Sequence, residues 1–422
     1  MAVVALSILA VAGMVAFQAG KISDEESAEF RAALDASRES QVERGEYLAL
    51  AGNCFSCHTT GSGGLMAGGV SFETPFGTIY STNITPDPDA GIGNWTALQF
   101  LNSMRHGVRA DGQHLYPAFP YTAFTKVTDE DLAALFVYLK SIPAVPQENT
   151  ANDIAFPFSM RSLMAVWKTM FFDEGTFGAD ESRSAEWNRG AYLVDAFAHC
   201  GACHTPRNLL GAERTGMAMA GGVYIDKVPS GNLRPWSAPN LTSAPSGLGL
   251  WQVGEVASYL KTGINAHIAT FGPMNEVIIN STRHLNEVDV NAMAVYLKSL
   301  PPIEPDSNAT APNNVLGMGR TLYNLHCGTC HLPTGLGDVE SAPQLAAGSL
   351  VVQASNPASL INVILDGPEM PDPPLATQWR KPMEDFRYLL DDQEIAALAS
   401  YLRSEWGNKG GEVTPEQVAK QR

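Results

Sequence analysis

A pattern of apolar residues with a helical period occurs three times along the chain. Residues 128–142 read TDEDLAALFVYLKSI, in which a Thr and an Asp stand in capping-box spacing and apolar positions recur every three or four residues. Residues 286–300 and 391–406 repeat this arrangement, with Tyr-Leu-Lys or Tyr-Leu-Arg at the same place. We therefore expect three helices with buried tyrosines, each closing a repeated unit.

A second helical pattern, which contains a glycine, opens each unit. The stretches RGEYL, from Arg44, and RGAYL, from Arg189, correspond to each other, and Gly319 with Tyr323 holds the same place in the third unit. A small residue in an apolar helix lets another backbone approach closely. We expect another helix to cross at this glycine.

A Cys-x-x-Cys-His motif follows the glycine-containing helix in each unit. The motif residues are Cys54, Cys57 and His58; Cys200, Cys203 and His204; and Cys327, Cys330 and His331. This motif attaches haem c covalently, because the thiols bond to the porphyrin and the imidazole binds the iron. The three copies use all six cysteines of the chain. We expect three covalently bound haem c groups.

Two other uses of paired cysteines fit the sequence less well. A zinc site needs four ligands, so two pairs would form one site and leave the third pair and three histidines unexplained. A dithiol redox pair belongs at a strand-to-helix turn of a βαβ unit, and the sequence has no such pattern. Haem attachment accounts for every cysteine.

The repeats predict a mainly α protein with three tandem class I cytochrome c domains and an N-terminal hydrophobic helix. The first two units also share the related stretches STNIT, at residues 81–85, and SAPNLT, at residues 237–242. The predicted divisions are 1–39, an anchor or signal with a tether; 40–143, domain 1; 144–183, an apolar connector; 184–301, domain 2; 302–311, a linker; 312–407, domain 3; and 408–422, a C-terminal tail.

The N-terminal segment is apolar enough to act as an export signal or an anchor. Residues 2–17 are aliphatic or aromatic apart from Ser7 and Gly13, and residues 6–22 could lengthen the helix toward the roughly 20 residues that span a membrane. No Lys or Arg precedes the segment, and no clean cleavage site follows it. Haem c is attached outside the bacterial cytoplasm. We expect an uncleaved anchor or a cleaved signal, and a location at the periplasmic face of the inner membrane.

The connector between the first two domains is too apolar to be a free linker. Residues 157–172 read PFSMRSLMAVWKTMFF. We expect this stretch to pack between domains, against a partner subunit or on the membrane.

The charge of the chain excludes one class of partner. The 44 acidic residues exceed the 27 Lys and Arg residues, which gives a net charge of −17. Nucleic-acid binding needs clustered cations, so it is not expected. An acidic surface suits a basic protein patch or simply keeps the protein soluble.

A low-spin haem needs a second axial ligand, and a methionine sulfur raises the reduction potential. In a cytochrome c fold this ligand comes from a loop just ahead of the last helix. Met274 holds this place in the second unit and Met383 in the third, where Met370 is the competing residue.

The first unit has no methionine in the corresponding loop. Residues 115–121 read LYPAFPY, and His114 is the strong ligand type beside them. Met66, Met104 and His106 are more remote candidates, and an open iron site is a further alternative.

Four stretches carry a resemblance to a known family over nearly the whole chain. They are TPFGTIYSTNITPD (74–87), SAEWNRGAYLV (184–194), HCGACHTPRN (199–208) and SEWGN (404–408). The chain resembles the three-haem cytochrome c subunit of membrane-bound bacterial periplasmic dehydrogenases. The family loop in the first unit resembles LYPAMPY, whose Met ligates iron, and Phe119 occupies that position here. This departure resembles the molybdenum-containing branch.

The resemblance implies an electron-transfer subunit rather than a catalytic one. The expected partner is a dehydrogenase catalytic subunit, either molybdopterin-dependent with an iron–sulfur subunit, or a flavin or quinoprotein enzyme. The expected electron acceptor is ubiquinone or another respiratory carrier. The alternative is a self-sufficient multihaem oxidoreductase, in which an open first haem acts as in a peroxidase.

Overall fold

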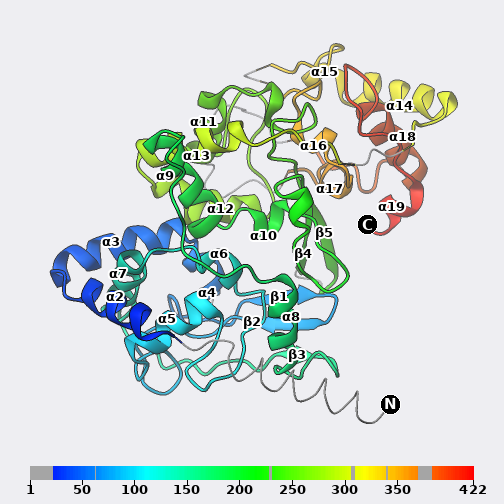
Figure 1. The fold of residues 1–422 in the computed structure, drawn as a ribbon. Coiled ribbons are helices and arrows are strands. Elements are labelled where there is room, and N and C mark those ends of the chain that lie inside the picture. Colours follow the sequence, from blue (N-terminus) through cyan, green and yellow to red (C-terminus); the bar gives the residue numbers. More distant parts are fainter. Residues whose placement is uncertain (1–21, 62, 228–230, 306–308, 339–340, 369–382) are drawn as a thin grey trace, which may run out of the picture. The chain divides into compact units, whose positions relative to one another are not determined.

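The computed structural model describes residues 22–61, 63–227, 231–305, 309–338, 341–368 and 383–422. These residues are mostly helical (Figure 1), so the mainly α prediction is confirmed. The chain divides into two compact units. Unit 1 comprises residues 1–182 and 192–199, and unit 2 comprises residues 183–191 and 200–422. Unit 2 holds most of the second and third predicted domains, and the three-domain division stays a prediction.

Unit 1 combines helices with one small antiparallel sheet. The sheet has the order β1-β2-β3 and joins the hairpin β1 (Ser71–Thr74) and β2 (Gly77–Tyr80) to β3 (Asp153–Ile154). Its helices are α2 (Asp24–Leu34), α3 (Arg38–Ala51), α4 (Cys54–His58), α5 (Ala97–His106), α6 (Tyr121–Phe124), α7 (Asp129–Leu139), α8 (Leu163–Phe171) and the π-helical turn η1 (Leu193–Phe197).

Unit 2 contains a two-stranded antiparallel sheet and the remaining helices. The sheet pairs β4 (Gly222–Lys227) with β5 (Leu233–Ala238). The helices are α9 (Ala185–Tyr192, whose last residue belongs to unit 1), α10 (Gly201–His204), α11 (Val253–Thr262), α12 (Met274–Asn280), α13 (Glu287–Ser299), α14 (Asn313–His326), α15 (Gly328–His331), α16 (Leu350–Gln353), α17 (Ala358–Asp366), α18 (Asp392–Leu402) and α19 (Pro415–Ala419), with single 3-10 turns at Thr215–Met217, Leu248–Leu250 and Thr282–His284.

The three predicted closing helices are present as α7, α13 and α18. Each begins with a polar residue whose side chain accepts a hydrogen bond from a backbone N–H of the first turn, and these residues are Thr128, Asn286 and Asp391. The tyrosines of the repeated tripeptide, Tyr138, Tyr296 and Tyr401, are all buried. The sequence prediction for these helices is confirmed.

A glycine lies at the close approach of the opening and closing helices in each repeat. A Cβ atom on Gly45 would overlap the carbonyl of Ala134 in α7, and one on Gly319 would overlap the carbonyl of Ala397 in α18. Gly190 meets the carbonyl of Ala292 in α13 in the same way. Only a residue without a side chain permits this separation, so the predicted role of the glycines is confirmed.

An ion pair stands next to the glycine in the first two repeats. Arg44 pairs with the buried Asp131 of α7, and Arg189 forms two hydrogen bonds of 2.7 Å with the carboxylate of Asp289 in α13. Tyr192 also donates a hydrogen bond to Asp131, at 2.7 Å. These contacts fix the register in which the helices cross.

The Lys or Arg at the third position of the repeated tripeptide connects a loop to the closing helix by hydrogen bonds. Lys140 donates to the carbonyl of Ile92, and Lys298 donates to that of Leu248. The third repeat has Arg403 instead, a fully buried residue that donates to the carbonyls of Val352, Ala354, Gly410 and Gly411. The C-terminal tail therefore packs against α18 as part of the third repeat.

The apolar connector packs within unit 1. Ala165, Trp167 and Lys168 of α8 are buried, and the Trp167 ring lies edge-on to Tyr121 with 6.5 Å between the centroids. Leu163, Val166 and Met170 on the same helix are exposed. The connector thus contains a helix with one packed face and one exposed apolar face.

The predicted N-terminal hydrophobic helix, residues 2–22, lies almost wholly outside the described residues. Among the helices that the structure describes, none is both long and apolar enough to span a bilayer.

The two glycines of α14 give a matched test of the helix crossing. Gly319→Ala should destabilise the protein by about 2 kcal/mol, because the new methyl group overlaps the carbonyl of Ala397. Gly317→Ala, two residues earlier in α14, meets no atom within 4 Å and should be stabilising by about 0.5–1 kcal/mol. Thermal unfolding of both variants measures the difference. Equal midpoints would show that the crossing does not constrain position 319.

Candidate haem sites

Each Cys-x-x-Cys-His motif forms one helical turn. The motifs lie on α4 and on the short helices α10 and α15, whose N-terminal neighbours are Cys200 and Cys327. Residues three and four apart share one side of a helix, so both thiols and the imidazole of a motif face the same way. All six cysteines lie within the described residues. This is the donor set that covalent haem attachment requires.

The imidazole of each motif is held in the tautomer that can bind iron. The Nδ1 atom of His58 lies 2.6 Å from the carbonyl oxygen of Thr82; for His204 and Pro239 the distance is 2.8 Å, and for His331 and Pro343 it is also 2.8 Å. A carbonyl only accepts, so Nδ1 carries the proton and Nε2 keeps its lone pair. Burial lowers the pKa of all three rings, which keeps them neutral. The residues present therefore fit a haem iron.

A buried asparagine braces the accepting loop in the first two repeats. Asn83 Oδ1 accepts from the backbone N and the hydroxyl of Thr85, at 2.9 and 2.7 Å, and its Nδ2 donates to the carbonyl of Val145. Asn240 makes the equivalent bonds to Thr242 and Ile303. Both side chains are 2% exposed. The related stretches at 81–85 and 237–242 thus position the carbonyls that orient the haem histidines.

The sequence analysis did not identify Thr82, Pro239 and Pro343 as site residues. Their function is carried by a backbone carbonyl, which leaves no side-chain signature. The repeated Asn-x-Thr was the available signal in the first two repeats.

Met274 and Met383 both lie within the described residues. Met274 is the first residue of α12 and is partly buried. Met383 is also partly buried and packs against the core of the third repeat, which includes Phe386 and Leu365. Met370 lies outside the described residues. Both methionines stay predicted ligands.

The loop after α5 and the loop after α11 form corresponding backbone hydrogen bonds to the glycine that ends each helix. Leu115 N donates to the carbonyl of Gly107 at 2.8 Å, and Thr270 N donates to that of Gly263 at 2.7 Å. Both glycines end their helix with a positive φ. Four residues beyond these amides stand Phe119 and Met274. Phe119 therefore has the register of the predicted ligand Met274, as the sequence analysis inferred.

His114 does not correspond to Met274. It corresponds to Ala269 of the second repeat, because His114 forms a bridge to Val108 and Ala269 forms the equivalent bridge to Ile264. Its side chain is buried, and its Nδ1 atom lies 3.1 Å from Nζ of Lys168. Burial and this charge lower the pKa of His114 to about 4. An ammonium group only donates, so a neutral His114 carries its proton on Nε2, the reverse of the three motif histidines. The contact with Lys168 occupies Nδ1 and therefore opposes iron binding through that atom. The assignment of His114 as an iron ligand stays a prediction from the sequence.

Lys168 is a buried cation that ties the connector to this loop. Its Nζ atom donates to the carbonyls of His106 and Gly107, the latter at 2.9 Å, and lies 4.7 Å from the centre of the Tyr121 ring. The carbonyls at the C-terminal end of α5 stabilise the positive charge.

The more remote candidates Met66, Met104 and His106 are all buried.

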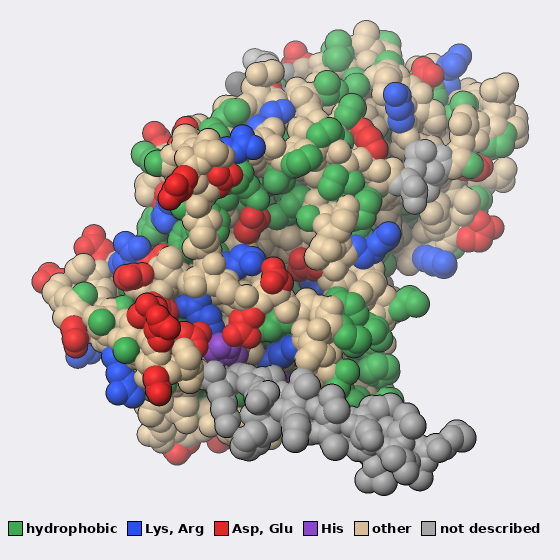
Figure 2. Space-filling model, in the orientation of Figure 1, with side chains coloured by type: hydrophobic (Ala, Val, Ile, Leu, Met, Phe, Trp, Pro, Cys, Tyr) green, Lys and Arg blue, Asp and Glu red, His purple; other side chains and the backbone are tan. Residues whose placement is uncertain are grey.

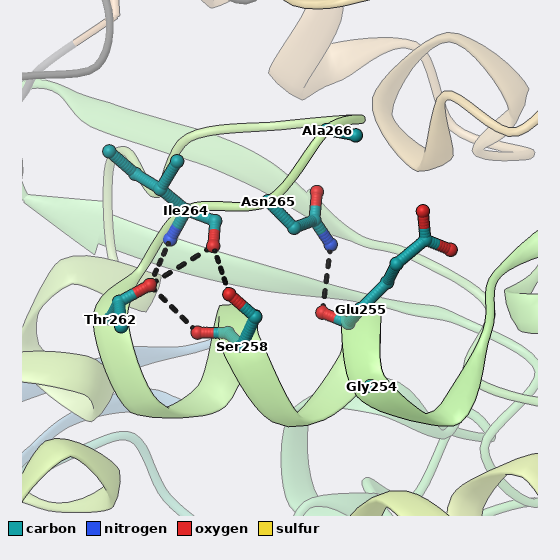
Figure 3. Close-up of a pocket in the computed structure, with 7 residues that line it drawn as sticks. All are labelled: Gly254, Glu255, Ser258, Thr262, Ile264, Asn265 and Ala266. Atoms are coloured by element: carbon teal, nitrogen blue, oxygen red, sulfur yellow. Dashed lines mark hydrogen bonds between the residues drawn. The ribbon is translucent and has the colours of Figure 1, made fainter.

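A pocket in unit 2 lies apart from the haem motifs. It is lined by Gly254, Glu255, Ser258, Thr262, Ile264, Asn265 and Ala266. The polar groups bond to one another (Figure 3): Thr262 donates to the carbonyl of Ser258, the Ser258 hydroxyl to that of Ile264, and Asn265 to that of Glu255. None of the motif residues lines it, and its hydrogen-bonding groups are already used.

Acidic side chains are spread over much of the face drawn in Figure 2. This distribution agrees with the net charge of −17.

Comparison with known proteins identifies similar sequences. The cytochrome c family model matches residues 42–143 and 318–406. A nicotinate dehydrogenase subunit of Pseudomonas putida is 42% identical over 373 residues, which cover 86% of this chain and 30% of that longer protein. The cytochrome c subunit of the quinone-type alcohol dehydrogenase of Gluconobacter oxydans is 38% identical, over 91% of this chain and 82% of its own length. The fructose dehydrogenase cytochrome subunit of Gluconobacter japonicus is 36% identical, over 89% and 82%.

The shared register of Phe119 and Met274 predicts the effect of placing a thioether in the first repeat. Phe119→Met should raise the near-infrared sulfur-to-iron absorption by about half, if two such ligands are present in the parent, and should raise the lowest reduction potential. A redox titration with near-infrared detection measures both. His114→Ala is the matched control and should leave the absorption unchanged. An unchanged spectrum in Phe119→Met would refute the register argument.

Proposed function

This chain belongs to the family of dehydrogenase cytochrome c subunits, and on this premise we propose that it is a three-haem subunit that carries electrons from a partner dehydrogenase to a respiratory acceptor. Electron transfer is the function of such subunits, and the motif histidines support it here. The observation that carries the proposal is the set of three Nδ1 hydrogen bonds to carbonyls, which leave Nε2 of His58, His204 and His331 available to iron.

The chemistry of the proposed function needs no acid, base or nucleophile from the chain. When bound, haem c supplies one-electron redox chemistry, as its iron alternates between the ferric and ferrous states. The six cysteines would hold the haem groups in place, the backbone carbonyls orient the motif histidines as proximal ligands, and the predicted ligands Met274 and Met383 would raise the potential. The chain therefore acts by positioning and by tuning potential.

The partner is proposed from the relatives and from Phe119. The relatives include subunits of nicotinate, alcohol, fructose and gluconate dehydrogenases. We favour a molybdopterin enzyme with an iron–sulfur subunit over flavin or quinoprotein enzymes, because Phe119 departs from the usual methionine. The 42% identity to the nicotinate dehydrogenase subunit supports a dehydrogenase as the partner. Ubiquinone is the proposed acceptor. Copurification of the chain with its partner tests this choice.

A peroxidase-like function is less well supported. It would need an open iron in the first repeat with a polar group above it. Phe119 instead packs near Phe124, with 5.4 Å between ring centroids, and the nearby His114 is bonded to Lys168. The purified chain alone should therefore not turn over peroxide.

The haem count follows from the use of all six cysteines. The intact mass of the purified protein should exceed that of the bare chain by three haem groups, and acid–acetone should extract none of them. Replacing both Cys327 and Cys330 with Ala should reduce the increment to two. A parent protein with two haems or fewer would contradict the proposal.

Met274→Ala and Met383→Ala should each weaken the near-infrared sulfur-to-iron band and lower one reduction potential, because a thioether ligand is lost. The exposed Met318 of α14 provides a control, since Met318→Ala changes a methionine that is not a predicted ligand. A redox titration of the three variants measures the effect. Wild-type titrations for both Met274→Ala and Met383→Ala would show that the ligands are other residues.

Membrane association is proposed to depend on residues 2–22. The net charge of −17 opposes binding to anionic lipid, so apolar insertion must hold the protein. Deleting these residues behind a cleavable export signal should move the chain, expressed without its partner, to the soluble fraction after ultracentrifugation. Release of the intact protein by high salt would contradict an apolar anchor.

A further inference from the structure

Three side chains from separate segments of unit 1 meet at the C-terminal end of α5. They are Glu26 of α2, His106 of α5 and Glu174, which follows α8. Each offers one ligand atom, and the three atoms lie within 4.8 Å of one another. None of these residues belongs to a Cys-x-x-Cys-His motif. The cluster is therefore a site separate from the proximal haem ligands.

His106 is the centre of the cluster. Its side chain is 4% exposed, and neither ring nitrogen makes a hydrogen bond within the described residues. Nδ1 lies 2.7 Å from Oε1 of Glu174, and Nε2 lies 3.7 Å from Oε1 of Glu26. The Glu174 oxygen is close but lies off the direction that a hydrogen bond requires, since the nitrogen makes none. Buried ring nitrogens are normally hydrogen-bonded or bound to a metal.

Supporting contacts orient the ligand atoms. The Oε2 atom of Glu26 accepts from the backbone N and the hydroxyl of Ser23, both at 2.8 Å, which leaves Oε1 toward His106. Burial raises the pKa of Glu26, but these hydrogen bonds and the charges of His106 and Arg105 lower it by more, so the carboxylate stays ionised. Lys168 holds the backbone carbonyl of His106. Such outer contacts are typical of metal ligands.

The neighbouring cation Arg105 is already engaged elsewhere. It donates to the carboxylate of Asp129, at 2.5 Å, and to the carbonyl of Thr125. It therefore does not fill the space between the two glutamates.

We propose that Glu26, His106 and Glu174 bind a divalent metal ion, with zinc as the best match. One imidazole and two carboxylates form a donor set that zinc accepts, with a water as fourth ligand. Tetrahedral zinc sets its nitrogen and oxygen ligands about 3.3 Å apart, and one ligand atom from each of the three residues lies within 4.8 Å of the other two, so a modest adjustment reaches that spacing. The contacts of 2.7 and 3.7 Å involve different ring nitrogens, of which one binds the ion. Glu174 is 46% exposed, so it can adjust and admit water.

The ion would clamp three segments together. It would join helix α2 and the segment after α8 to α5, and α5 leads into the loop that carries Phe119 in the register of the predicted ligand Met274. The competing arrangement is direct pairing of His106 with the two carboxylates, which needs no metal. The two arrangements differ in their response to added zinc.

The experiment uses the purified haem-containing protein after treatment with a chelator. Metal analysis after addition of zinc chloride and dialysis should give one zinc per chain besides the haem iron. Calorimetric titration should show that Glu174→Gln and Glu26→Gln each weaken zinc binding by about 100-fold or more, as expected for loss of a ligand. The exposed Glu130 at the start of α7 supplies the matched control, Glu130→Gln, which should bind zinc as the parent does.

Two further measurements distinguish loss of zinc binding from loss of folding. Zinc should raise the thermal unfolding midpoint of the parent and of Glu130→Gln but not of Glu174→Gln, because a ligand that binds the folded state stabilises it. The visible haem spectrum and the iron content of all variants check that they fold. No tightly bound zinc in the parent, or equal binding in Glu174→Gln and Glu130→Gln, would overturn the proposal and favour direct pairing of His106 with the carboxylates.

Discussion

The hydrogen bond from Nδ1 of each motif histidine to a backbone carbonyl is the interaction on which the haem sites depend. The cysteines lie in the same helical turn as the histidine, so local structure alone brings the thiols together. The direction of the imidazole is different, because it is set by a loop 12 to 35 residues away. In the first two repeats that loop is held by Asn83 or Asn240, which reach the chain beyond the closing helix. The direction of the motif imidazole is thus coupled to the packing of the whole repeat.

The parts of the fold that the sequence predicted are those in which neighbouring residues decide the outcome. The closing helices could be recognised from period and capping, and the glycines from their place in an apolar helix. The carbonyls of Thr82, Pro239 and Pro343 could not, because any residue supplies a carbonyl. The contacts of Lys168 and the meeting of Glu26, His106 and Glu174 join residues 47 to 148 positions apart. No periodicity reports such pairs.

The first repeat shares its frame with the second repeat and differs from it at the position of the predicted methionine ligand. Its glycine crossing, its carbonyl-bonded histidine and its braced loop match those of the second repeat. Phe119 stands where the second repeat has Met274. Lys168 donates a hydrogen bond to Nδ1 of His114, which precedes this loop, so the proton of a neutral His114 lies on Nε2. The difference lies in a side chain rather than in the backbone, so it can alter a reduction potential without altering the fold.

The contacts of α8 bear on how the protein could be divided into fragments. A fragment ending at residue 143, where the repeat pattern stops, would lose Lys168 and leave the carbonyls of His106 and Gly107 and the ring of His114 without it. It would also uncover Tyr121, which packs against Trp167. Residues 192–199 belong to the same compact unit, since Tyr192 bonds to Asp131. A fragment cut between the repeats would therefore expose part of its core. Exchanging the first domain among relatives requires that the connector helix α8 be exchanged with it.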